Sequence, residues 1–126
     1  MNVVDSSGWL EYFAAGPTAD FFAAAVEAVE ELVVPTVSLY EVFKRVLQQR
    51  DEGDALQAIA LMQQGSVVDL TPPLALEAAR TSVALGLPMA DGILLATARA
   101  HQATLWTQDS DFAGIDGVRY IARESP

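Results

Sequence analysis

The sequence predicts an α/β fold built around a parallel β-sheet. Five short apolar segments have the character of strands, and longer segments with apolar residues at spacings of three and four separate them. Strands that alternate with helices in this way pair in parallel through right-handed crossovers. We expect the strands at residues 2–4, 32–35, 66–70, 104–107 and 118–121.

Six helices are predicted between these strands from their start and stop signals. Asp5-Ser6-Ser7 and Thr18-Ala19-Asp20 supply capping side chains, and Pro88 suits a first helical turn. Gly16-Pro17 and Gly86 end helices. The expected elements are helices over residues 8–14, about 20–29, 36–50, 54–64, 72–85 and 88–101, a turn or short helix at 108–114, and a loose tail at Glu124-Ser125-Pro126.

The composition is that of a soluble globular protein. The chain has 126 residues, 52% of them apolar, and a mean hydropathy of +0.26, so we expect one domain over residues 1–126. There is no cysteine, which excludes disulfides and thiolate zinc sites. No segment resembles a signal peptide or reaches the roughly 18–20 apolar residues of a membrane span. The expected location is therefore the cytoplasm.

The net charge of −10 argues against a protein that wraps a polyanion. Seventeen Asp and Glu residues face seven Lys and Arg residues, whereas nucleic-acid-binding proteins usually carry a basic surface. The charge is compatible with a small catalytic contact to nucleic acid that a metal ion bridges, and with binding to a basic protein partner.

Four acidic residues stand at the edges of otherwise apolar segments. Asp5 and Asp109 each follow a predicted strand, whereas Glu41 and Asp91 lie in the opening turns of predicted helices. Strand C-termini and the N-termini of the following helices share one edge of a parallel sheet, which is where ligands bind. Carboxylate oxygens suit Mg²⁺ or Mn²⁺, and a cluster of four carboxylates is unfavourable without a cation. The pattern therefore indicates a metal site.

Each of these carboxylates also has a purely structural interpretation. Asp5 and Asp109 can cap a helix or a turn, and Asp91 in a first helical turn gains about 0.3–1 kcal/mol from the helix dipole. Glu41 can pair with Lys44 or Arg45 for about 0.2–0.5 kcal/mol. Other chemistries fit less well, because His101 is the only histidine and the chain contains no nucleophile elbow, phosphate loop or dinucleotide fingerprint.

Four segments give the chain a resemblance to the PIN-domain ribonucleases, and most closely to the VapC-like toxins of bacterial and archaeal toxin–antitoxin pairs. They occur in the order and spacing of the family and extend over essentially the whole chain. The segments are Val3-Val4-Asp5-Ser6-Ser7, Ser38-Leu39-Tyr40-Glu41-Val42, residues 90–98 and residues 103–112. Gly92 departs from the family pattern, which often has Ala or another apolar residue directly after Asp91, and it loosens the predicted helix slightly.

The resemblance implies a three-layer α/β/α fold with a five-stranded parallel sheet and Mg²⁺ or Mn²⁺ at its carboxyl edge. It implies that Asp5, Glu41, Asp91 and Asp109 form an acidic quartet that binds the metal and acts in catalysis. Ser6 and Thr107 are then supporting polar groups and Asp111 a secondary acid. It also implies a homodimer, and a cognate VapB-like antitoxin whose basic segment fills the acidic cleft.

The resulting hypothesis is a metal-dependent endoribonuclease, the toxin of a toxin–antitoxin pair, that cleaves structured RNA such as tRNA with metal-activated water. Lys44, Arg45 and Arg50 are candidates for steering the RNA, or they form a solvated helix face with local ion pairs. One alternative is a non-catalytic PIN-like module that binds a partner protein. Another is a different phosphoryl-transfer domain, but the first predicted strand is followed by Asp5-Ser6-Ser7 where a dehalogenase-like phosphatase has Asp-x-Asp. A receiver domain has a lysine near the end of its last strand, and the only lysine of this sequence is Lys44.

Overall fold

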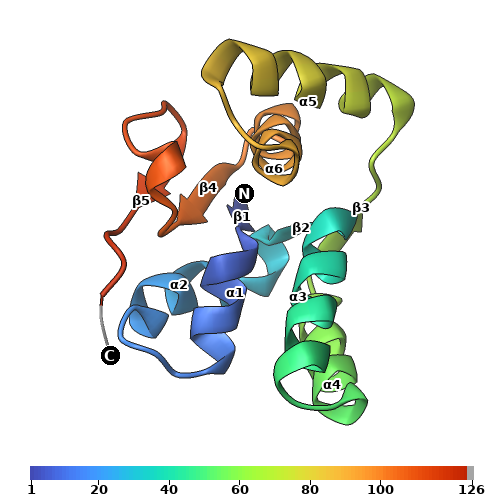
Figure 1. The fold of residues 1–126 in the computed structure, drawn as a ribbon, viewed down its shortest axis with the longest axis vertical. Coiled ribbons are helices and arrows are strands. Elements are labelled where there is room, and N and C mark those ends of the chain that lie inside the picture. The colour runs from blue at the N-terminus through green and yellow to red at the C-terminus, as the bar shows by residue number, and fades with distance from the viewer. Residues whose placement is uncertain (125–126) are drawn as a thin grey trace.

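The computed structural model describes residues 1–124, and all five predicted strands and six predicted helices are present there (Figure 1). Residues 125 and 126 of the predicted tail lie outside the described residues. The elements are β1 (Asn2–Val4), α1 (Ser6–Phe13), α2 (Ala19–Val26), η1 (Val29–Glu31), β2 (Val33–Pro35), α3 (Thr36–Gln49), α4 (Glu52–Met62), β3 (Ser66–Val68), α5 (Pro72–Leu85), α6 (Met89–Ala100), β4 (Thr104–Thr107), η2 (Ser110–Phe112) and β5 (Val118–Tyr120).

Every strand pairing is parallel, as predicted, but the strands form two ladders. Strands β1, β4 and β5 make a three-stranded sheet in the order β1-β4-β5, and β2 pairs with β3. The two sheets are linked by an isolated parallel bridge between Asn2 and Leu32. The single five-stranded sheet that the resemblance implies is therefore divided in two. The strands are only three or four residues long, and Pro35 at the end of β2 has no N–H with which to extend a ladder.

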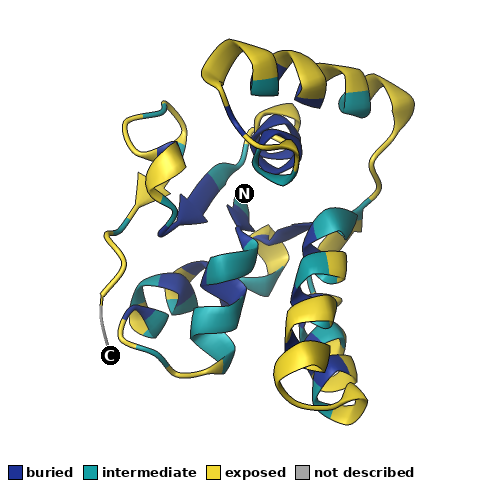
Figure 2. Cartoon of the chain, in the orientation of Figure 1, coloured by how far each residue is buried: buried dark blue, intermediate teal, exposed yellow. Residues whose placement is uncertain are grey.

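The two faces of the sheets bury different side chains, because side chains alternate along a strand. Val4, Val34 and Trp106 pack in a core cluster with residues of α1, α2, α3 and α4. Their neighbours Val3, Val33 and Leu105 pack in a second cluster with residues of α6 and η2. The sheets therefore lie between two helical layers, and α5 covers the outer side of α6, which is the most completely buried helix (Figure 2).

Helices α5 and α6 approach each other closely at Gly92. A Cβ atom at this position would lie 1.8 Å from Ser82 Oγ and 3.1 Å from the carbonyl oxygen of Ala78. The glycine that loosens the predicted helix is thus the residue that allows α5 to pack on α6, directly beside Asp91.

Among residues 1–124, no single helix has the length and hydropathy needed to cross a membrane. Helices α5 and α6 reach that length and hydropathy only together, and they are bent by 114° relative to each other.

Candidate metal centre

Asp5 lies at the end of β1 and caps the N-terminus of α1. Its Oδ1 accepts hydrogen bonds from the backbone N–H of Gly8 at 2.9 Å and from Ser7 Oγ at 2.8 Å, and its Oδ2 accepts one from Thr107 Oγ1. The side chain is buried. The pKa of Asp5 lies above its ordinary value, mainly because burial disfavours the charged form. The three hydrogen bonds lower this pKa, and the charge of Asp109 raises it slightly. The structural interpretation of Asp5 as a helix cap is thus correct, and it does not exclude a second role.

Thr107 connects Asp5 to Asp109 across the β1–β4 pair. Its hydroxyl donates to Asp5 and accepts a hydrogen bond from the backbone N–H of Asp109 at 2.9 Å. Asp109 in turn accepts a hydrogen bond from the backbone N–H of Asp111 at 2.9 Å and caps η2. Thr107 is fully buried, so one hydroxyl orients the two carboxylate-bearing strand ends relative to each other.

Glu41 is held from a different direction. It lies in the second turn of α3, and its Oε1 accepts a hydrogen bond from Ser6 Oγ at 2.6 Å. Ser6 is the first residue of α1 and follows Asp5 directly. This bond therefore ties Glu41 of α3 to the end of β1.

Asp91, in the first turn of α6, lies at the electrostatic centre of the cluster. Its pKa is raised to about 7, first by burial and then by the charges of four other carboxylates, which are those of Asp109, Asp5, Asp111 and Glu41. Carboxylate oxygens of Asp91, Asp109 and Asp111 lie within 4.8 Å of one another. Three converging carboxylates are a donor set that fits a hard divalent cation, and a cation there offsets their mutual repulsion.

The structure brings the four acidic residues predicted from the sequence together with Ser6, Thr107 and Asp111. The group of three that is spaced for one cation contains Asp111, which the resemblance ranks only as a secondary acid, and it does not contain Asp5 or Glu41. The reason is local: η2 turns the chain after β4, so that Asp111 returns toward Asp109.

Sequence reasoning missed three polar groups around the site. Ser7 Oγ and the Gly8 N–H both orient Asp5, and the capping positions after an N-cap aspartate are the signal that points to them. The third is Gln108, a buried side chain that accepts a hydrogen bond from Thr18 Oγ1 at 2.7 Å. This bond holds the backbone between Thr107 and Asp109 in place. No local sequence pattern predicts a contact between residues 18 and 108.

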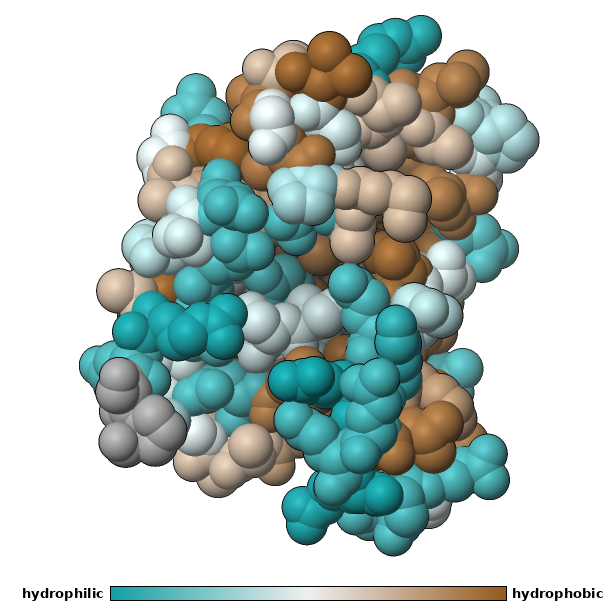
Figure 3. All heavy atoms as spheres, in the orientation of Figure 1, coloured by the Kyte–Doolittle hydropathy of each residue, from teal (hydrophilic) through white to brown (hydrophobic). Residues whose placement is uncertain are grey.

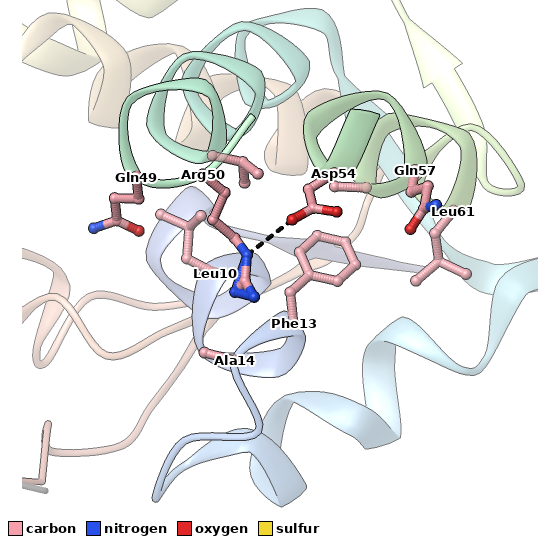
Figure 4. A pocket seen from close by; sticks show the side chains of 10 residues that line it. Leu10, Phe13, Ala14, Gln49, Arg50, Asp54, Gln57 and Leu61 are labelled. Carbon is pink, nitrogen blue, oxygen red and sulfur yellow. Dashed lines mark hydrogen bonds and ion pairs between the residues drawn. The ribbon is translucent and has the colours of Figure 1, made fainter. Parts of the chain in front are cut away.

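A separate pocket of about 500 Å³ lies between the C-terminal parts of α1 and α3 and the outer side of α4 (Figure 4). Arg50 and Asp54 form an ion pair at 2.9 Å at its edge. The pocket shares no residue with the acidic cluster, and its lining consists of Leu10, Phe13, Ala14, Val46, Gln49, Arg50, Asp54, Gln57, Ala58 and Leu61.

The fold is similar to that of several solved structures. A toxin–antitoxin complex from Klebsiella pneumoniae is 22% identical with a TM-score of 0.79, and the match covers 94% of this chain and 96% of that one. A Mycobacterium tuberculosis VapC described as a sarcin–ricin loop cleaving toxin is 16% identical with a TM-score of 0.76 (92% and 95%). A DNA-bound VapBC from Salmonella typhimurium is 12% identical with a TM-score of 0.73 (97% and 98%).

No curated protein matches the sequence. The family model for the PIN domain matches residues 3–118, which include most of β1, every acidic residue of the site and all six helices. With the fold and nearly the whole length of the chain in agreement, the protein belongs to the PIN-domain family.

Proposed function

We propose that this protein is a metal-dependent endoribonuclease and the toxin of a toxin–antitoxin pair, acting in the cytoplasm. The observation that carries the proposal is the convergence of five carboxylates at Asp91, with its pKa raised to about 7. The repulsion among these carboxylates lowers stability unless a cation offsets it, and such unfavourable clusters are found mainly at functional sites. Membership of the PIN-domain family supports the same chemistry.

We assign Asp91, Asp109 and Asp111 to the cation, which is Mg²⁺ or Mn²⁺. When bound, such an ion activates water as a nucleophile and neutralises the charge that develops on a phosphodiester. Asp5 lies outside the group of three that is spaced for this cation, but its Oδ2 accepts a single hydrogen bond and keeps a lone pair for a water on the cation. Glu41, oriented by Ser6, has a free oxygen that can accept a hydrogen bond from the attacking water.

The substrate class is structured RNA, such as tRNA. Its phosphodiester lies against the carboxylates, and hydrolysis leaves new ends at a discrete position. The proposal draws support from the Mycobacterium tuberculosis VapC of the same fold, which is described as cleaving an RNA loop.

The test is incubation of purified, antitoxin-free protein with total bacterial RNA, with and without Mn²⁺ or Mg²⁺, followed by sequencing of new 5′ ends. We expect discrete, metal-dependent ends that disappear with Asp91→Asn. Glu77→Gln is the matched control, because it removes an exposed carboxylate that pairs only with Arg80 on α5. Folded protein that binds metal and creates no ends would contradict the nuclease.

We also propose two protein contacts. An antitoxin is the first partner, because four of the structural neighbours are described as VapBC or toxin–antitoxin systems. Its basic segment fits the acidic cleft, and the pocket between α1, α3 and α4 is a second candidate docking surface. The exposed apolar side chains of α5 and the start of α6 are candidates for a homodimer contact (Figure 3). Val83→Glu, at a residue that is 87% exposed, tests the dimer by a fall to monomer mass in light scattering.

The pocket also keeps a second candidate function open, a non-catalytic module that binds a partner protein. Its lining mixes apolar and polar side chains and shares no residue with the acidic cluster, so partner binding there needs no metal. Partner binding without turnover, unaffected by Asp91→Asn, is the result that favours it.

A further inference from the structure

The outer surface of α3 carries two cations beside Glu41. Lys44 and Arg45 follow Glu41 by three and four residues, and side chains at these spacings are neighbours on a helix, with roughly 5–6 Å between their Cβ atoms. Both are exposed. The bond from Ser6 to Glu41 directs that part of α3 toward the acidic cluster. The two cations therefore lie beside Glu41, the one carboxylate of the cluster that α3 contributes.

Lys44 and Arg45 are available to an external anion. Within residues 1–124, the ion pairs are Arg50 with Asp54 and Arg80 with Glu77, each at 2.9 Å. Figure 4 shows the guanidinium of Arg50, the third cation of α3, directed at Asp54. Packing does not need the other two cations either, because both are exposed and the buried residues of α3 are Ser38, Val42 and Val46.

An exposed aromatic ring lies next to one of these cations, Lys44. Tyr40 directly precedes Glu41 and is 64% exposed, and the Nζ atom of Lys44 lies 5.7 Å from the centroid of its ring. Single-stranded nucleic acid is typically bound by cations that follow its backbone together with aromatic side chains that stack on its bases. We call Tyr40, Lys44 and Arg45 the α3 strip.

If its substrate is a polyanion, the acidic site needs cations nearby that bind the phosphates. The carboxylates around Asp91 repel phosphates, and the net charge of −10 adds to the repulsion. Cations beside Glu41 can hold the strand while the scissile phosphodiester lies among the carboxylates.

We propose that the α3 strip binds the RNA strand next to the scissile phosphodiester: Arg45 and Lys44 contact phosphates, and Tyr40 stacks on an unpaired base. This inference rests on the proposed nuclease function and names residues that position its substrate. Within a structured RNA, the segment that enters the site is then an unpaired one.

The test measures binding separately from cleavage. In an Asp91→Asn background with Mg²⁺, fluorescence anisotropy gives the affinity for a labelled single-stranded oligoadenylate over a series of salt concentrations. Arg45→Ala is expected to weaken binding about tenfold at low salt. It should also make the slope of log K against log salt shallower by about 0.7, the value for one lost phosphate contact. Arg45→Lys should restore the slope.

Tyr40→Ala is expected to weaken binding about tenfold without changing the salt slope, whereas Tyr40→Phe keeps the ring and the affinity. Arg80→Ala is the matched control, because it removes an exposed cation from α5. Unchanged affinity and slope in the strip variants, or no oligoadenylate binding at all, overturn the inference even if the wild type cuts RNA. Weakened binding in those variants supports the strip even if the wild type cuts nothing, and in that case the proposed nuclease fails alone.

Discussion

Asp91 carries a pKa of about 7, and this value has a consequence for stability. Burial and four neighbouring carboxylates raise it from the ordinary 3.8 of an aspartate. Between these two values the folded protein holds a proton that the unfolded chain releases. In metal-free protein, the contribution of Asp91 to the free energy of unfolding is therefore fully present below about pH 4. This contribution is lost as the pH rises through about 7.

We expect the melting temperature of metal-free protein to fall between pH 5 and pH 8 by more than that of Asp91→Asn. Excess Mg²⁺ should reduce the difference, because a cation holds Asp91 ionised. Differential scanning fluorimetry in EDTA and in Mg²⁺ measures both effects. Equal pH dependence in the two proteins would show that Asp91 does not titrate in this range.

Thr107 is the residue whose loss should damage the site most without removing a carboxylate. Thr107→Val keeps the shape of the side chain but leaves the buried Oδ2 of Asp5 and the backbone N–H of Asp109 without their partner. An unsatisfied buried polar group costs about 1–3 kcal/mol, so we expect a loss of that size in the free energy of unfolding by urea. Thr107→Ser retains the hydroxyl and should recover most of it, and failure of this rescue would contradict the bridging role.

At the level of elements, the packing of α5 on α6 depends on Gly92. Alanine is the better helix former by about 1 kcal/mol, but its Cβ would meet Ser82 Oγ at 1.8 Å and the carbonyl of Ala78 at 3.1 Å. Overpacking of this kind costs about 1–3 kcal/mol, so Gly92→Ala should destabilise the protein and shift Asp91, its neighbour on α6.

Ser82→Ala in the same chain separates the two effects. It removes the oxygen that the new Cβ would meet, so the double variant should be more stable than Gly92→Ala alone, with a coupling energy measurable in a double-mutant cycle. Additive effects of the two substitutions would show that the close approach at Ser82 does not determine the cost.

For the molecule as a whole, the concentration of negative charge makes metal binding a source of stability. A cation that binds only the folded state stabilises it by about 2.7 kcal/mol at a concentration 100 times its Kd. We expect Mg²⁺ or Mn²⁺ to raise the melting temperature more than NaCl of the same ionic strength does. The shift should shrink in Asp91→Asn and persist in Glu77→Gln, whose exposed carboxylate pairs with Arg80. An equal shift in both variants would indicate general screening of the −10 charge and no specific site.

The sequence by itself determined the order of the elements, the parallel direction of the strands and the edge at which the acidic residues meet. These features follow from local patterns: apolar runs, the capping side chain of Asp5, and the rule that strand ends and helix starts share one side of a parallel sheet. Thr18 precedes α2 as predicted, but its side chain bonds to Gln108 and does not cap the helix. The match to the PIN-domain family model confirms the resemblance to that family that four short segments of the sequence indicate.

Only the tertiary structure decided how the site is held and how the sheet is divided. The hydroxyl of Thr107 bonds to a carboxylate 102 residues away, Thr18 bonds to Gln108 across 90 residues, and Gly92 is explained by a helix that packs against it. The turn of η2 brings Asp111 into the group that is spaced for one cation. The isolated bridge between Asn2 and Leu32 is likewise a result of tertiary packing. Contacts of this range depend on the packing of whole elements, and no periodicity or capping signal in one segment records them.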